Sequence, residues 1–154
     1  MSAQELLDSA RALLDTFVAG QNAPEEDRLD VWIAATNLPH AVRALQNAGW
    51  GYLSAVTGLD FGPEAGQMEA LYHFCNGPAV LTLRLRLGRA TPSVPSLCPI
   101  IPSAGFFERE LSEMFGITVE GAPNTDHLYL PDDWPDGVYP LRKDFDPAAL
   151  QISG

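Results

Sequence analysis

The sequence predicts an α+β fold with two layers, in which helices pack on one face of a mostly antiparallel sheet. Helix-like and strand-like periods alternate along the chain, tight hairpin signals join consecutive strand candidates, and 46% of the 154 residues are hydrophobic. A chain of this length is large enough for one core, and hairpins favour antiparallel pairing over a doubly wound sheet. We expect an α+β domain at residues 1–119 and an extended, partner-docking tail at residues 120–154.

The individual elements follow from the spacing of apolar residues and from the turn residues between them. Apolar residues every three or four positions predict a helix, and strict alternation predicts a strand with one buried face. The expected elements are a helix at 2–19, a polar turn at 21–27, a strand at 28–36, a helix from 37 to about 48, strands at 51–57, 68–75 and 79–87, a proline-rich connector at 90–102, and a helix at 103–116.

Several residues are expected to set the ends and faces of these elements. Ser2, with Glu5 three residues later, is a plausible cap of the first helix, and Gly20 is placed to end it. In the strand at 79–87, leucines alternate with polar residues, so one face should be buried and the other wet. The residues expected on the wet face are Thr82, Arg84 and Arg86.

Charge and composition exclude several classes of function. The net charge is −11, and residues 101–154 carry 10 acidic and 3 basic groups. Nucleic acids and anionic membrane surfaces both require clustered Lys and Arg, so we expect neither as a partner. The N-terminus lacks the pattern of a signal peptide, and no stretch approaches the roughly 20 apolar residues of a membrane span. Cys75 and Cys98 are interpreted as free thiols in a reducing cytosol.

A search for catalytic, cofactor and metal sites identifies no candidate strong enough to predict one. No glycine-rich loop has a phosphate-binding pattern, and the cysteines and histidines lack metal-ligand spacing. We therefore predict no catalytic, cofactor-binding or metal residue. One alternative stays open, a small stand-alone enzyme that uses His73 and Cys75 on one strand face.

The last third of the chain is the most informative part. Residues 108–117 read Glu-Arg-Glu-Leu-Ser-Glu-Met-Phe-Gly-Ile, and residues 140–145 read Pro-Leu-Arg-Lys-Asp-Phe. Arg109 and Glu113 are four residues apart on a helix and are expected to pair. The tail between and beyond these motifs holds large apolar groups but cannot fold by itself. It must therefore pack either on its own domain or on a neighbouring chain.

These motifs resemble those of the C subunit of NADH:quinone oxidoreductase, the respiratory complex I. The family pattern is Glu-Arg-Glu-x-x-Asp-x-Phe-Gly-Ile, then Gly-His-Pro, then a Leu-Pro-x-x-Trp segment that ends in Pro-Leu-Arg-Lys-Asp-Phe. Residues 108–117 match the first motif with Glu113 in the aspartate position, and residues 130–134 and 140–145 match the last two. The chain departs from the pattern at Ala122 and Tyr139, where the family has histidine, and at Asp126-His127, where the family has a basic pair.

The resemblance implies a non-catalytic scaffold subunit of the hydrophilic arm of such a complex, on the cytoplasmic side of the membrane. It implies that partner subunits carry the iron–sulfur clusters, that the complex uses NAD and quinone, and that the tail lies along the neighbouring D subunit. The alternative is the equivalent subunit of a membrane-bound hydrogenase or a ferredoxin-linked dehydrogenase. The residues expected at the partner interface are Glu108, Arg109, Glu110, Glu113, Trp134, Leu141, Arg142, Lys143 and Asp144.

Overall fold

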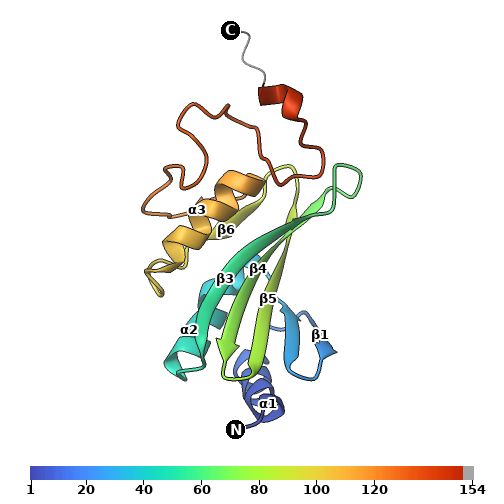
Figure 1. The fold of residues 1–154 in the computed structure, drawn as a ribbon. Coiled ribbons are helices and arrows are strands. Elements are labelled where there is room, and N and C mark those ends of the chain that lie inside the picture. Colours follow the sequence, from blue (N-terminus) through green and yellow to red (C-terminus); the bar gives the residue numbers. More distant parts are fainter. Residues whose placement is uncertain (151–154) are drawn as a thin grey trace.

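The computed structural model describes residues 1–150 and has the predicted α+β architecture (Figure 1). Its helices are α1 (Ala3–Leu14), α2 (Leu38–Asn47) and α3 (Ala104–Phe115), with short 3-10 helices η1 (Ala35–Asn37) and η2 (Pro147–Leu150). Its strands are β1 (Gly20–Glu25), β2 (Arg28–Trp32), β3 (Tyr52–Asp60), β4 (Gln67–Asn76), β5 (Ala79–Gly88), β6 (Ser93–Pro95) and β7 (Thr118–Glu120).

Five of the strands form one sheet in the order β1-β2-β5-β4-β3. The β1–β2, β3–β4 and β4–β5 pairs are antiparallel, which confirms the predicted class, whereas β2 and β5 are parallel. Parallel neighbours need a long crossover, and here the chain between β2 and β5 supplies α2 and the β3–β4 hairpin. The strands β6 and β7 form a separate two-stranded parallel pair.

The core lies on the face of the sheet that the helices cover. Alternate residues of β4, including Tyr72 and Phe74, lie opposite leucines of β5 and are fully buried. Helix α1 packs near β5, and α3 packs beside β3. The Trp50 indole donates a hydrogen bond of 2.9 Å to the Leu6 carbonyl, which connects the segment after α2 to α1. The helices and the sheet therefore share one continuous core.

The N-terminal segment differs from the prediction in where its helix ends. Ser2 and Glu5 form the expected capping box. However, α1 ends at Leu14, and Gly20 begins strand β1 where a polar turn was expected. The Ala19 N–H donates to the Trp32 carbonyl, so pairing with β2 organises this segment. All residues of β1 after Gly20 are exposed, and an exposed edge strand has no apolar alternation that would identify it in a sequence.

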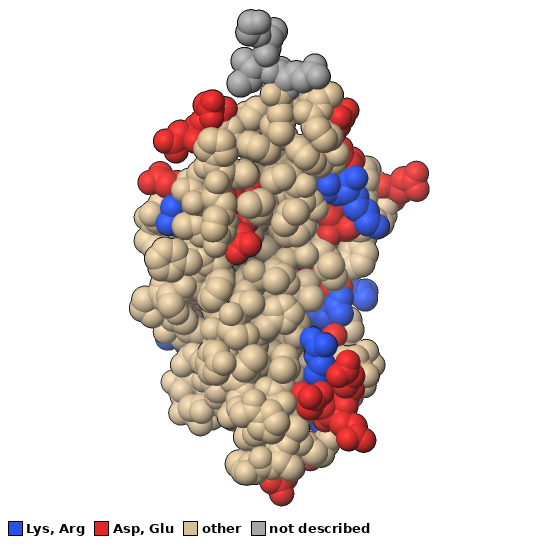
Figure 2. Space-filling view, in the orientation of Figure 1, with Lys and Arg blue, Asp and Glu red and all other residues tan. Residues whose placement is uncertain are grey.

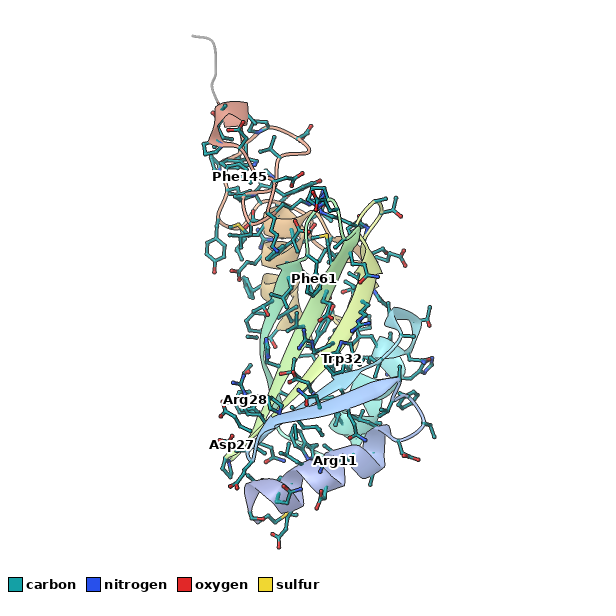
Figure 3. All side chains as sticks on the ribbon, turned by 90° about the vertical axis from the view of Figure 1, so that its right-hand side faces the viewer. Arg11, Asp27, Arg28, Trp32, Phe61 and Phe145 are labelled. Atoms are coloured by element: carbon teal, nitrogen blue, oxygen red, sulfur yellow. The ribbon has the colours of Figure 1, made fainter. Side chains whose placement is uncertain are left out.

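The face of the sheet opposite the helices is less exposed to solvent than predicted. Arg86 is exposed, but Thr82 is buried and Arg84 is half-buried. Arg84 forms ion pairs with Glu69 at 2.7 Å and Asp30 at 3.1 Å. The Arg84 guanidinium also lies 4.7 Å from the centroid of the Trp32 ring, and Figure 3 labels Trp32 on this part of the molecule. Cross-strand pairing between polar residues therefore removes much of this face from water.

The proline-rich connector predicted at 90–102 contains a short strand. Ser93–Pro95 form β6, which pairs with β7, and the Ser96 N–H continues the contact by donating to the Glu120 carbonyl at 2.8 Å. The three-residue strand pairs with a segment about 25 positions away. The local sequence around Ser93–Pro95 therefore does not indicate the strand.

Candidate functional site

Helix α3 and the tail after β7, residues 121–150, form the candidate site. In Figure 1 the tail runs in orange and red around the end of α3, at the end of the molecule opposite the N-terminus. Helix α3 ends at Phe115, and Gly116 after it has φ of +72° and donates a backbone hydrogen bond to the Ser112 carbonyl. A side chain at Gly116 would overlap the Tyr139 ring and the Arg142 guanidinium. Glycine therefore permits both the helix end and the close approach of the tail.

Glu108 is buried and lies on the inner side of α3, facing the connector. Its carboxylate accepts hydrogen bonds of 2.8 Å from the Ser96 hydroxyl and from the Leu97 N–H. The Cys98 thiol lies 3.2 Å from the same carboxylate. Burial raises the pKa of Cys98, and the hydrogen bond with Glu108 adds to the effect, so this thiol is kept protonated.

Arg109 and Glu113 do not pair with each other, so the predicted pair is wrong. The buried Glu113 carboxylate accepts backbone hydrogen bonds from Leu128, Tyr129 and Leu130, at 3.0, 2.8 and 3.4 Å. Arg109 donates 2.9 Å hydrogen bonds to the carbonyls of Asp126 and His127. Both charges thus bind the backbone of the tail, which otherwise has few backbone partners of its own. A hydrogen bond in which one group is charged is stronger than one between two neutral groups.

Asp60, at the end of β3, binds the second half of the tail. Its carboxylate pairs with Arg89 at 2.8 Å and accepts the N–H of Lys143 at 2.9 Å and of Gly62 at 3.0 Å. Arg89 also pairs with Asp144 at 2.6 Å. The hydrogen bond from Arg89 holds the pKa of Asp60 well below its usual range, although burial opposes the shift. Asp60 and Arg89 are not among the predicted site residues, because no local pattern links residues 60, 89 and 143.

Arg142 and two aromatic contacts complete the attachment of the tail to its own domain. Arg142 Nε donates a 2.7 Å hydrogen bond to the Phe115 carbonyl at the end of α3. A cation at a helix C-terminus also interacts favourably with the helix dipole. The Arg142 guanidinium lies 4.7 Å from the Tyr139 ring centroid, and the Trp134 and Phe145 rings stack with centroids 6.4 Å apart. The tail therefore packs on the chain's own domain, and its contact with a neighbouring chain stays a prediction.

A pocket of about 260 Å³ lies between α3 and the tail. We call it the α3–tail pocket. Its walls include Arg109 and Glu113 from α3, and Trp134 and Tyr139 from the tail. Four positions after α3 at which the chain departs from the family pattern all line it; they are Ala122, Asp126, His127 and Tyr139. The departures are spread over 18 positions of the sequence but gather in one place.

The remaining predicted interface residues lie toward the outside. Glu110 and Leu141 line a smaller cavity of about 190 Å³ between β3 and α3. Leu141 is 54% exposed, and Lys143 is also exposed. Figure 2 shows that the face turned to the viewer is largely uncharged, with acidic side chains toward the end formed by the tail and basic side chains mainly along the right edge. The expected role of these residues at a partner interface stays a prediction.

The face with His73 and Cys75 has other hydrogen-bond partners. The two ring nitrogens of His73 lie 3.0 Å from the Thr57 hydroxyl and 2.9 Å from the Thr82 hydroxyl. The Cys75 thiol contacts the Ser54 hydroxyl at 3.4 Å. Among residues 1–150, no group of three or more His, Cys, Asp or Glu side chains has the geometry to hold a metal ion. Nor does any helix in these residues have the length and apolar character needed to cross a membrane.

Residues 31–151 match the family described as "Respiratory-chain NADH dehydrogenase, 30 Kd subunit". The chain is 35% identical over 122 residues to formate hydrogenlyase subunit 5 of Escherichia coli (strain K12), covering 77% of this chain and 21% of that protein. It is 34% identical over 111 residues to the C subunit of NADH-quinone oxidoreductase of Moorella thermoacetica, covering 71% of each. The chain covers less than two thirds of the first curated relatives that it matches.

The fold has a solved counterpart in the membrane-bound sulfane sulfur reductase, an archaeal respiratory membrane complex. A chain of that complex superimposes with a TM-score of 0.79 at 23% identity, over 95% of this chain and 88% of that one. Identity this low supports the shared fold and nothing finer. The superposition extends over nearly the whole chain, so the comparison includes both the sheet and the α3–tail region.

Proposed function

The chain belongs to the respiratory-chain NADH dehydrogenase 30 Kd subunit family, and from this premise we propose that it is a non-catalytic scaffold subunit of a complex I-type NADH:quinone oxidoreductase. In this proposal it holds partner subunits in place while they transfer electrons to quinone with coupled ion translocation. The proposed position is peripheral, on the cytoplasmic side of the membrane. The proposed partners are a D-like subunit of the same complex and the subunits that carry the iron–sulfur clusters.

One observation carries this proposal. The family match includes α3 and the tail, and charged side chains hold the tail in place beside α3. Arg109 and Glu113 bind tail backbone, and Asp60 and Arg142 attach its second half. A segment ordered before binding loses less conformational entropy on association than a disordered one. We therefore propose that partners meet a preformed surface that combines α3 with the tail, and that flavin, clusters and quinone bind to other subunits.

The second candidate is the equivalent subunit of a membrane-bound hydrogenase or of a ferredoxin-linked dehydrogenase. The 35% identity to formate hydrogenlyase subunit 5 favours keeping this candidate. Both candidates assign the chain the same scaffolding role and differ in the electron donor. A nickel-ligating cysteine pattern in the co-purified large subunit would assign the complex to the hydrogenases.

Affinity purification from native membranes tests the proposal. A tagged full-length chain, extracted in mild detergent, should co-purify with cluster-bearing subunits identified by mass spectrometry. Glu110→Ala should reduce this recovery with little change in the melting temperature of the isolated chain, because Glu110 is only half-buried and lines an outward-facing cavity. Flavin or iron absorbance in the isolated chain, or recovery of the chain without any partner subunit, would contradict the proposed role.

A further inference from the structure

The α3–tail pocket is small, and its walls are held in place by the rest of the chain. At about 260 Å³ it is smaller than the roughly 300–1,000 Å³ typical of small-molecule sites. It is open to solvent and lies between a helix and a segment that is fastened on both sides. Glu113 holds residues 128–130 on one side, and Arg142 and Asp60 hold residues 142–143 on the other. The pocket is thus part of the fold and does not require a ligand to form it.

Arg109 and Glu113, which line the pocket, already have hydrogen-bond partners on the tail backbone. Arg109 directs its hydrogen bonds to the carbonyls of Asp126 and His127, and Glu113 accepts hydrogen bonds from three tail N–H groups. Asp126 and Asp136 are among the residues that line the same pocket, and both are exposed. Within residues 1–150, neither carboxylate takes part in a hydrogen bond or an ion pair. The pocket therefore presents unbalanced negative charge.

Two aromatic residues, Trp134 and Tyr139, line the same space, and each ring already has one neighbour in the chain, Phe145 and Arg142 respectively. Aromatic rings beside carboxylates suit a guanidinium, which is planar, stacks on rings and binds carboxylates with two parallel hydrogen bonds. Lysine offers only a compact, strongly hydrated charge. The surrounding tail is acidic as well: residues 120–150 contain seven acidic and two basic side chains. This field favours the approach of a basic protein surface.

We infer that the α3–tail pocket receives an arginine side chain from a basic segment of a partner subunit, with Asp126 and Asp136 as its carboxylate contacts. This inference rests on the proposed role as a scaffold subunit and assigns that role a docking point. The arginine enters between α3 and the tail and contacts Trp134 and Tyr139. Its two carboxylate partners lie at the rim, where the charge is desolvated only when the partner arrives.

Charge reversal in the assembled complex tests the inference. Asp126→Lys with Asp136→Lys should lower recovery of the partner subunits about tenfold or more, as expected when a hydrogen-bonded interfacial charge pair is replaced by repulsion. Glu25→Lys with Glu26→Lys is the matched control. These residues are exposed at the β1–β2 turn, far from the tail, near Asp27 and Arg28 in Figure 3. Both double variants change the net charge equally, so the control should retain recovery.

A photo-crosslinking residue at position 124 then identifies the partner segment in the native complex. The expected product contains an arginine, and changing that arginine to glutamate should restore recovery of the Asp126→Lys, Asp136→Lys variant. If the double variant assembles as well as the control, the inference is wrong while the scaffold role stands. If the unaltered chain recovers no partner subunit, the scaffold role itself fails.

A second measurement on the isolated full-length chain guards against misfolding of the variant. N-acetyl-arginine amide should shift the NMR signal of the Trp134 indole N–H, which donates to the Val138 carbonyl at 2.7 Å. N-acetyl-glutamate amide should not shift it. Equal shifts with both probes, or shifts with the arginine probe that persist after Asp126→Asn with Asp136→Asn, would overturn the assignment.

Discussion

At the scale of single residues, Asp60 joins three parts of the chain that are far apart in the sequence. Its carboxylate connects the end of β3, Arg89 after β5, and the Lys143 N–H of the tail. The side chain of Asp60 is almost fully buried, and that of Arg89 is 12% exposed. A buried carboxylate is tolerated only when its lone pairs are satisfied. The ion pair and two backbone N–H groups meet this requirement.

Asp60→Asn should destabilise the protein by about 3 kcal/mol, since it leaves the Arg89 charge without its buried partner. The amide also has one acceptor oxygen where the carboxylate has two. Asp144→Asn removes only the exposed end of the network, because Asp144 is 52% exposed, and should cost less than about 1 kcal/mol. Urea unfolding of both variants measures the difference. Equal losses would show that Asp60 is no more important than a surface ion-pair residue.

His73 should make stability depend on pH. Burial lowers the pKa of His73, and the charge of Arg28 adds to the shift, while Asp30 opposes it. The unfolded chain therefore binds a proton more readily than the folded chain. Stability should be fully present above the ordinary histidine pKa of about 6.5 and should fall as pH drops below it. Melting temperatures between pH 5 and 8 test this, and His73→Gln should reduce the slope. An unchanged slope would contradict it.

At the scale of elements, the packing of α3 beside β3 depends on the absence of a side chain at one position. Gly58 lies on the core face of β3, and a Cβ there would come within 2.7 Å of the Phe115 ring. Real Cβ atoms do not approach so closely, so the ring or the helix would have to move. Phe115 is also the residue whose carbonyl accepts the hydrogen bond from Arg142. Displacement of α3 would therefore extend to the tail.

Gly58→Ala should destabilise the domain by about 1–3 kcal/mol through overpacking. Gly88→Ala is a matched strand control, because nothing lies within 4 Å of a Cβ at Gly88 and its φ is not positive. That control should be neutral or slightly stabilising, since alanine has fewer unfolded conformations than glycine. Thermal unfolding compares the two, and a neutral Gly58→Ala would mean that α3 adjusts freely on β3.

At the scale of the whole molecule, the tail is fastened to its own domain by residues from three separate regions. The contacts come from β3, from the segment after β5 and from α3. Figure 1 shows the tail extending the molecule beyond the sheet and α3, at the end opposite α1. Loss of the tail contacts should therefore free the tail and leave the sheet and its core folded.

Gly116→Ala tests this division. Alanine at this position meets both a positive φ and the Tyr139 ring, whereas Gly121 has φ of +78° with nothing within 4 Å of a Cβ. Gly121→Ala should lower the free energy of unfolding by about 1 kcal/mol, because only the positive φ disfavours alanine there. Gly116→Ala should lower it by more. Limited proteolysis should cut the tail faster in Gly116→Ala than in Gly121→Ala. Equal cleavage rates would show that Tyr139 does not hold the tail on α3.

The sequence by itself determined the elements whose signals are local. The capping box at Ser2, the alternating leucines of β5 and the glycine end of α3 are each written within a few neighbouring residues, and the structure contains all three. The motifs at 108–117 and 140–145 likewise indicated the family. The charged residues of α3 are also evident from the sequence, but the groups that their side chains bind are not.

Only the tertiary structure decided which segments those residues meet. Strand β1 exists because β2 pairs with it, and β6 exists because β7 does. Glu113 binds tail N–H groups about 15 positions away, and Asp60 binds the N–H of Lys143 across 83 positions. Such contacts depend on how the chain brings distant segments together, so spacing within one helix or strand does not specify them. The surface proposed for partners is built from these long-range contacts.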